Sequence, residues 1–245
     1  MERKQIPLLS LADSCRVYAM SSGGKIEDNG DYVVYRSSSF FYGRTCILKS
    51  DNLEKTISEI KQNNPTPICC FTQELMQNDF NEIMTANGYA PMFVQTGMIF
   101  DLDKPFDEKI DEHIVTLNPS EAAINADIFE KALGGVPQEG FVSEAFAKEG
   151  PGKGMVYAYK DEGILKASAA ALFNKGVSGI HQVGTLPEYV RCGYARALLN
   201  RCLQDAKKAG MDQISLQASD MGKLVYDSMG FETVSHIPSF ILPPM

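Results

Sequence analysis

The chain has 245 residues, of which 44% are hydrophobic and 22% charged, a composition typical of a globular protein with one large domain or two average ones. Its formal net charge of -8 and isoelectric point near 5.0 argue against a surface for nucleic acids or anionic membranes, because phosphate contacts require clustered Lys and Arg. We therefore expect small molecules or other proteins as partners, with no nucleic acid and no membrane.

The six cysteines form no Cys-x-x-Cys pair, and none lies at zinc-binding spacing from the three histidines. This pattern predicts a reduced, cytoplasmic protein without a metal site. Cys69 and Cys70 lie in an apolar run and are interpreted as small buried side chains, with a redox role as the alternative. No stretch has the apolar length of a signal peptide or a membrane span, so we expect a soluble chain.

In the first half, helical spacing is found over residues 53–62 and 78–86, and strand-like runs cover 67–72 and 93–102. The charged, proline-containing segment from Asp101 to Glu112 then interrupts the hydrophobic pattern, which is typical of a linker. We therefore predict an N-terminal domain over residues 1–105 and a C-terminal domain over residues 112–245.

The second half begins with helical patterns over residues 122–133 and 141–148. Gly-containing turns then separate three strand-like segments, which predict an antiparallel meander over 155–159, 164–173 and 178–185. The strongest helix pattern covers residues 193–209, where apolar residues recur along one face until Gly210. A strand over 214–218, a helix over 221–228 and two short strands within 231–242 complete the prediction.

The two halves repeat one order of elements. Gly88 and Gly230 each precede an aromatic residue 142 positions apart, and the same offset relates Leu53 to Ala195. We interpret this as a tandem repeat of one architecture. A chance agreement of two alternating α/β patterns is the alternative.

The turn between the last strand of the meander and the long helix suits a phosphate group. A helix N-terminus has unpaired N–H groups and the positive end of the helix dipole. Gly193 allows close approach of a ligand, Ala195 keeps the next contact small, and Arg191 and Arg196 add positive charge. A glycine near a helix start is also ordinary turn chemistry. The glycine patterns of dinucleotide-binding and P-loop proteins are absent from the sequence.

This turn resembles the signature of the GNAT superfamily of N-acetyltransferases: Gln or Arg, two residues, Gly, one residue, then Gly or Ala. The chain matches it from Val190 to Ala195, with Val190 departing from the preferred Gln or Arg. A second block, Tyr226 to Phe231, resembles the family's Tyr-x-x-x-Gly-Phe ending. The resemblance covers roughly residues 115–245 and implies an α/β (α+β) fold. This fold has a mixed, mostly antiparallel sheet with splayed central strands, flanked by helices.

In that family acetyl-CoA is the co-substrate and lies between the two splayed strands, pairing with a free strand edge. The resemblance implies pantetheine binding by the backbone of Val183, Gly184 and Thr185, with a further contact from Ser219. It assigns the pyrophosphate to one loop, whose residues are Arg191, Cys192, Gly193, Tyr194, Ala195 and Arg196. It implies no metal.

The implied reaction is direct attack of a primary amine on the thioester, with CoA leaving as a thiolate. Tyr226 fits the general acid, because a phenol of pKa about 10 can give a proton to the leaving thiolate, whose thiol has a pKa of about 8.5. A tyrosine that only packs against the sheet is the alternative. His181 is the candidate base, with a core histidine equally open. Glu144 and Glu188 are weaker candidates, because such carboxylates usually face solvent.

No Gly-x-Ala turn precedes the helix at Leu53, so we expect one active site per chain and an N-terminal half that has lost cofactor binding. A non-catalytic acyl-CoA-binding or regulatory module of the same fold is one alternative function. A transferase that takes an aminoacyl group from tRNA is another, disfavoured by the acidic charge. The sequence names no acceptor, which we expect to be a small-molecule or peptide amine, and it leaves open a homodimer.

Overall fold

A computed structural model describes residues 1–37, 43–76, 78–135, 140–150 and 152–243. Its contacts divide the chain into two compact units. The first comprises Met1–Met98, Gln217–Leu224 and Glu232–Met245, and the second comprises Ile99–Leu216 and Val225–Phe231. The units are thus assembled from segments that alternate along the chain, whereas the division predicted between residues 105 and 112 cuts the chain once.

The second unit contains a mixed sheet built on an antiparallel meander. Its strands are β6 (Ile114–Leu117), β7 (Gly154–Asp161), β8 (Ile164–Leu172), β9 (Gly179–Thr185) and β10 (Gln213–Ala218). The first four are antiparallel in chain order, and β10 lies parallel to β9. The end of β5 (Ala90–Asp101) flanks β10, which gives the order β5-β10-β9-β8-β7-β6. The predicted meander and mixed sheet are therefore confirmed.

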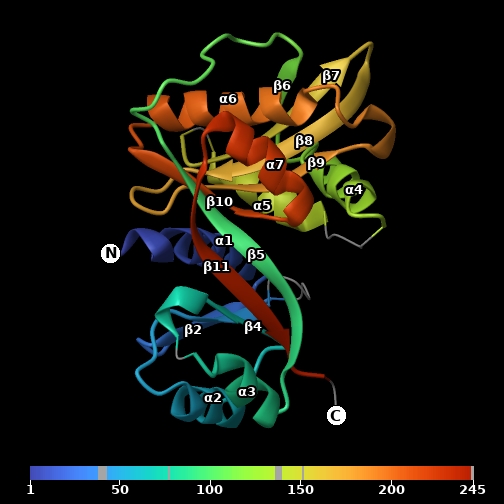
Figure 1. Cartoon of the computed structure of the whole chain (residues 1–245). Helices are drawn as coiled ribbons and strands as arrows, with labels where there is room; N and C mark the ends of the chain where they lie inside the picture. The colour runs from blue at the N-terminus through green and yellow to red at the C-terminus, as the bar shows by residue number, and fades with distance from the viewer. Residues whose placement is uncertain (38–42, 77, 136–139, 151, 244–245) are drawn as a thin grey trace. The chain divides into compact units, whose positions relative to one another are not determined.

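Three helices cover the two faces of this sheet (Figure 1): α4 (Ala123–Ala132) and α5 (Gly140–Glu149) on one, and α6 (Tyr194–Lys208) on the other. Gly154 faces α5 so closely that a Cβ there would lie 2.3 Å from the Phe146 carbonyl oxygen. Tyr157, on the opposite face of the same strand, donates a 2.8 Å hydrogen bond to Asp205 of α6. The residues of β7 thus face the α5 layer on one side of the sheet and the α6 layer on the other.

The first unit contains a second mixed sheet, with the order β1-β2-β3-β4-β11-β5. Its other strands are β1 (Lys25–Asp28), β2 (Tyr32–Arg36), β3 (Arg44–Ile47), β4 (Ile68–Phe71) and β11 (Glu232–Ile241). Its helical segments are η1 (Arg3–Gln5), α1 (Ile6–Ser21), α2 (Leu53–Gln62), η2 (Gln73–Leu75) and α3 (Phe80–Ala86). The elements predicted between residues 53 and 102 are confirmed, with end shifts of a few residues. Helix α1 and strands β1 to β3 were not predicted.

Both halves of the chain follow one order of elements. Strands β1, β2 and β3 form an antiparallel meander, followed by α2 and by β4 parallel to β3. Strands β7, β8 and β9 are followed in the same way by α6 and the parallel strand β10. Then α3 and β5 correspond to α7 (Asp220–Met229) and β11. This order agrees with the repeat interpreted from the 142-residue offset; that the first half descends from the acetyltransferase fold stays a prediction.

The C-terminal segment is a single strand, so the prediction of two short strands was wrong. β11 includes Pro238, and the residues of this strand have different partners before and after the proline. Before the proline, the backbone N–H of His236 donates to the carboxylate of Glu74 at 2.9 and 3.0 Å. After it, Ser239 begins the antiparallel pairing with β4. Pro238, which has no backbone N–H, thus lies between the residue that bonds to Glu74 and the first residue paired with β4.

Both cysteines of the pair at residues 69 and 70 are wholly buried on β4, as predicted. Cys70 has a polar neighbourhood: its Sγ lies 3.7 Å from Cys46 Sγ and 4.0 Å from Nη1 of buried Arg44. The hydrogen bond with Cys46 and the nearby guanidinium lower the pKa of the Cys70 thiol to about 7, against the effect of burial. Arg44 is therefore a core residue of the first unit.

Candidate active site

Strands β9 and β10 are aligned over only two residues and then separate. Gly179 and Ile180 lie opposite Ser215 and Leu216, but β9 continues to Thr185. Among the described residues, nothing on the β10 side pairs with β9 beyond Ile180. The opposite edge stays paired, with Ser168 and Ala167 of β8 opposite Gly184 and Thr185. The segment Val183–Thr185 therefore has one free edge, at the position predicted for pantetheine.

A β-bulge marks the point where the strands separate. On β8, Ser168 and Ala170 are two residues apart, whereas their partners Gly184 and His181 on β9 are three apart. The extra residue lies at Gln182, which has a φ of +49°. Bulges bend the strand that carries them and increase its twist. β9 therefore bends immediately after its last alignment with β10.

Four buried polar side chains from four elements surround this bulge. Nδ2 of Asn125 on α4 donates to the Gln182 carbonyl oxygen at 3.1 Å and to Oγ of Ser168 at 2.8 Å. The hydroxyl of Ser143 on α5 is 2.8 Å from Oδ1 of Asn125 and 3.1 Å from Oε1 of Gln182. None of the four residues was predicted from the sequence, because their partners are 18 to 57 positions apart and follow no local spacing.

Helix α4 packs directly on β9 at Gly184. A Cβ at this residue would lie 3.0 Å from Cα of Phe129 and 3.3 Å from Cβ of Ala132. The glycine is needed for space, since its φ is not in the left-handed region. This close packing covers the face of β9 and leaves its edge free.

The loop after β9 ends at an uncapped helix N-terminus. Gly193 is the N-cap of α6, with φ +86° and ψ -1°, and it has no side chain to cap the helix's first N–H groups. Arg191 also has a positive φ, +65°. Both Arg191 and Arg196 are exposed, and Nη2 of Arg196 donates to Ser228 Oγ at 2.5 Å. Free N–H groups, the helix dipole and two cations therefore meet at one exposed turn.

The remaining loop residues are held mainly through the backbone. The 3-10 turn η3 (Pro187–Tyr189) follows Leu186, whose N–H donates to the Lys166 carbonyl oxygen at 3.0 Å. The side chain of Val190 is 53% exposed and that of Cys192 is exposed. The departure from the signature at Val190 thus changes a side chain at the surface of the loop.

Tyr226 of α7 is 9% exposed, and its ring contacts Phe231 with centroids 5.8 Å apart. Burial, with a smaller contribution from nearby Cys202, raises the pKa of the Tyr226 phenol to about 12. The phenol therefore keeps its proton at neutral pH. Its proximity to Cys202 places it beside α6.

His181 lies on the other side of the sheet, where its ring stacks on Phe146 of α5 at 5.5 Å. The two proposed catalytic side chains are thus positioned by different layers. Glu144 forms a 3.5 Å ion pair with Lys148, and Glu188 is exposed on η3. Both carboxylates have the ordinary surroundings of surface groups.

Ser219 falls in the first unit, whereas the other predicted cofactor residues fall in the second. Its hydroxyl accepts a 3.2 Å hydrogen bond from the Gly222 N–H at the start of α7. This is the geometry of a helix N-cap. A cofactor contact from Ser219 stays a prediction.

The first unit has no comparable separation of strands among its described residues. All four residues of β3, Arg44 to Ile47, are aligned with β4. Residues 43–52, before α2, contain no Gly-x-Ala turn. Phe41 and Tyr42, which precede them, lie outside the described residues. The parallel pair that is open in the second unit is thus closed in the first.

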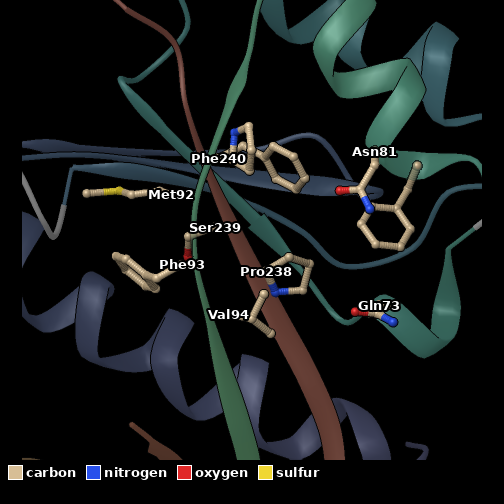
Figure 2. Close-up of a pocket in the computed structure, with 10 residues that line it drawn as sticks. Gln73, Asn81, Met92, Phe93, Val94, Pro238, Ser239 and Phe240 are labelled. Atoms are coloured by element: carbon tan, nitrogen blue, oxygen red, sulfur yellow. The ribbon is translucent and has the colours of Figure 1, made fainter. Parts of the chain in front are cut away.

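Figure 2 shows a pocket of about 270 Å³ in the first unit. It is mainly apolar, and its lining residues are Gln73, Phe80, Asn81, Pro91, Met92, Phe93, Val94, Pro238, Ser239 and Phe240. None of these is titratable, and none is a predicted site residue. The pocket therefore offers no acid or base for acyl transfer.

The described residues offer two observations on other classes of function. No group of three or more His, Cys, Asp or Glu side chains is positioned to hold a metal ion. No helix there is both long and apolar enough to cross a membrane.

Separated parallel strands, a free strand edge and a helix N-terminus open to a phosphate are the features that the resemblance to the GNAT superfamily implies. Residues 132–239 match the family model described as an acetyltransferase (GNAT) domain. This match confirms the resemblance to the GNAT superfamily seen in this part of the sequence. No curated protein gave a significant match.

Solved structures share the fold at low identity. A GCN5-related N-acetyltransferase from Kribbella flavida is 13% identical with a TM-score of 0.68, covering 98% of this chain and 96% of that chain. One from Sphaerobacter thermophilus is 17% identical with a TM-score of 0.56, covering 78% and 66%. A functionally unknown conserved protein from Staphylococcus epidermidis ATCC 12228 is 11% identical with a TM-score of 0.61, covering 89% and 92%. The predicted fold class is confirmed over nearly the whole chain.

Proposed function

We propose that the protein is an N-acetyltransferase that transfers an acetyl group from acetyl-CoA to a primary amine by direct attack. The observation that carries this proposal is the free edge of Val183–Thr185, next to the uncapped N-terminus of α6. A strand edge satisfies the amides of pantetheine by β-type pairing, and the helix N-terminus satisfies the pyrophosphate.

The loop binds the pyrophosphate mainly through backbone N–H groups. Gly193 has the left-handed conformation that turns the chain into α6, and a Cβ there would meet nothing within 4 Å. The approach to the first N–H groups is therefore open. Arg191 and Arg196 supply positive charge in a protein of net charge -8. Because this binding uses the backbone, an exposed valine at position 190 is compatible with it.

Tyr226 is the proposed general acid. The raised pKa of about 12 keeps its phenol protonated, as an acid requires. Complete transfer to a thiolate of pKa about 8.5 would be uphill by roughly 3.5 units, or about 5 kcal/mol. Tyr226 therefore acts mainly by donating a hydrogen bond to the sulfur as negative charge develops during C–S cleavage.

His181 is the proposed base, which takes a proton from the attacking amine directly or through a water molecule. Its place on β9, one residue before the bulge, supports this role. The closed β3–β4 pair supports one active site per chain, formed by the second unit. The acceptor is a small-molecule or peptide amine.

The proposal is tested by release of free thiol from acetyl-CoA in the presence of a panel of primary amines, with acetyl-CoA binding measured separately by calorimetry. We expect saturable binding and amine-dependent thiol release. Tight binding without release for any amine would favour a non-catalytic acyl-CoA-binding module. No binding at all would refute the assignment of the β9 edge.

A further inference from the structure

The hydrogen-bonded group of Asn125, Ser143, Ser168 and Gln182, here called the bulge network, has no counterpart in the chemistry proposed above. Asn125, Ser143 and Ser168 are wholly buried, and Gln182 is 6% exposed. Buried polar groups cost free energy unless they are paired, so a network of this size needs a structural reason. Its members lie on α4, α5, β8 and β9, and Asn125 links the other three by bonding the backbone carbonyl of Gln182 and the hydroxyls of Ser168 and Ser143.

Gln182 has a backbone conformation that glutamine rarely adopts. A φ of +49° brings the Cβ close to the backbone, and only glycine avoids this cost fully. Such a conformation persists where surrounding contacts determine it. Here Asn125 binds the carbonyl oxygen of Gln182 and Ser143 binds its side chain.

The side chain of Asn125 matches this place chemically. One amide group supplies two N–H donors and one acceptor. The donors bind the Gln182 carbonyl and Ser168, and the acceptor binds Ser143. Aspartate at this position would lose both donors, and alanine would lose all three bonds. The bulge network therefore depends on an amide at residue 125.

We propose that Asn125 is a positioning residue for acetyl-CoA: through the bulge network it holds Gln182 in the left-handed conformation that turns β9 away from β10. The inference rests on the proposed function, because it explains how the free edge of Val183–Thr185 is formed. Asn125 touches neither the cofactor nor the reacting atoms. It acts through the backbone of Gln182.

The bulge also fixes which side chains share a face. His181 packs on α5 and Gly184 packs on α4, on the same side of the sheet although they are three positions apart. In a regular strand, residues three apart face opposite sides. Loss of the bulge would therefore turn one of these residues away from its helix as well as closing the edge.

The test compares Asn125→Ala with a double variant that also carries Gln182→Gly, in the full chain. Asn125→Ala is expected to weaken acetyl-CoA binding about tenfold, the effect of losing the one bond, among its three, that holds the Gln182 carbonyl. Glycine adopts positive φ without the network, so the double variant should regain about fivefold or more of that loss. Tyr157→Phe is the matched control, because it removes one part-buried hydrogen bond to Asp205 on the other face of the sheet.

Unchanged acetyl-CoA affinity in Asn125→Ala would overturn the inference, and so would a double variant as weak as the single one. An effect of Tyr157→Phe as large as that of Asn125→Ala would also overturn it, since general destabilisation would then explain both. If Asn125→Ala does not fold, Ser143→Ala removes the hydroxyl that lies within hydrogen-bond distance of both Asn125 Oδ1 and Gln182 Oε1, and it is expected to weaken binding in the same direction.

A second readout separates this inference from the proposed function. Backbone ¹³C chemical shifts of Gln182 report its left-handed conformation without any ligand. If the wild-type protein binds no acetyl-CoA, the proposed function fails. The shifts then decide the role of Asn125: they should change to extended values in Asn125→Ala and stay unchanged in Tyr157→Phe. Left-handed shifts retained in Asn125→Ala would refute the positioning role.

Discussion

Replacing Gly184 with alanine adds one methyl group between β9 and α4. The new Cβ would lie 3.0 Å from Phe129 Cα, 3.3 Å from Ala132 Cβ and 3.4 Å from the Ile128 carbonyl oxygen. Two of these three atoms are helix backbone, so α4 must move by a few tenths of an ångström. Overpacking of this kind costs about 1–3 kcal/mol. The smaller entropy of the unfolded alanine chain offsets about 0.4–1 kcal/mol of that cost.

We therefore expect Gly184→Ala to lower the free energy of unfolding by about 1 kcal/mol, or about 2–4 °C in Tm. Gly184→Val should cost more, because its two further methyl groups meet the same helix. Thermal unfolding of the full chain measures this series, and calorimetric titration with acetyl-CoA reports whether the shift reaches the strand edge. Equal Tm values for all three proteins would refute the claim that α4 packs on β9 at this residue.

Four further predictions concern the loop and the acid. Gly193→Asn should retain more acetyl-CoA affinity than Gly193→Ala, because asparagine tolerates the positive φ better and the space around the residue is open; equal titration results for both variants would contradict a conformational role. Tyr226→Phe should lower kcat more than it raises the KM for acetyl-CoA, and an unchanged kcat would remove Tyr226 from the mechanism. Because the pKa of Tyr226 is raised to about 12, the phenol keeps its proton as pH rises through 10. The rate of the wild-type protein should therefore show no decrease at alkaline pH that is absent from Tyr226→Phe. Val190→Ala should change acetyl-CoA affinity less than about twofold, since the loop binds through its backbone.

Local patterns in the sequence predicted the elements that form the cofactor strand and loop. Helix α6 has a regular apolar face, which residues such as Leu198, Leu199 and Leu203 bury. Glycine-containing turns separated β7, β8 and β9 for the same local reason. The loop could be recognised because Gly193 and the downstream block that begins at Tyr226 match the spacing of the two signature blocks of the family.

Elements without a one-sided pattern were missed. Helix α1 buries eleven of its sixteen residues, among them small ones such as Ser10, Ser14 and Ala19, so apolar residues are not confined to one face. The bulge at Gln182 has no glycine to indicate a positive φ. Asn125 and Ser143 have their partners on other elements, and such long-range hydrogen bonds leave no periodic signal. The two short strands predicted within residues 231–242 are one strand, β11, in which the Glu74 carboxylate accepts from the His236 N–H just before Pro238.

The central claim is that acetyl-CoA pairs with the free edge of β9 and with the N-terminus of α6. Hydrogen-exchange mass spectrometry, with and without acetyl-CoA, tests it most directly, because backbone hydrogen bonds to a ligand slow amide exchange. We predict slower exchange in peptides covering Val183–Thr185 and Arg191–Arg196, with no change in Arg44–Ile47 of the first unit. Unchanged exchange at both of the first two segments, under conditions where acetyl-CoA is bound, would contradict the account.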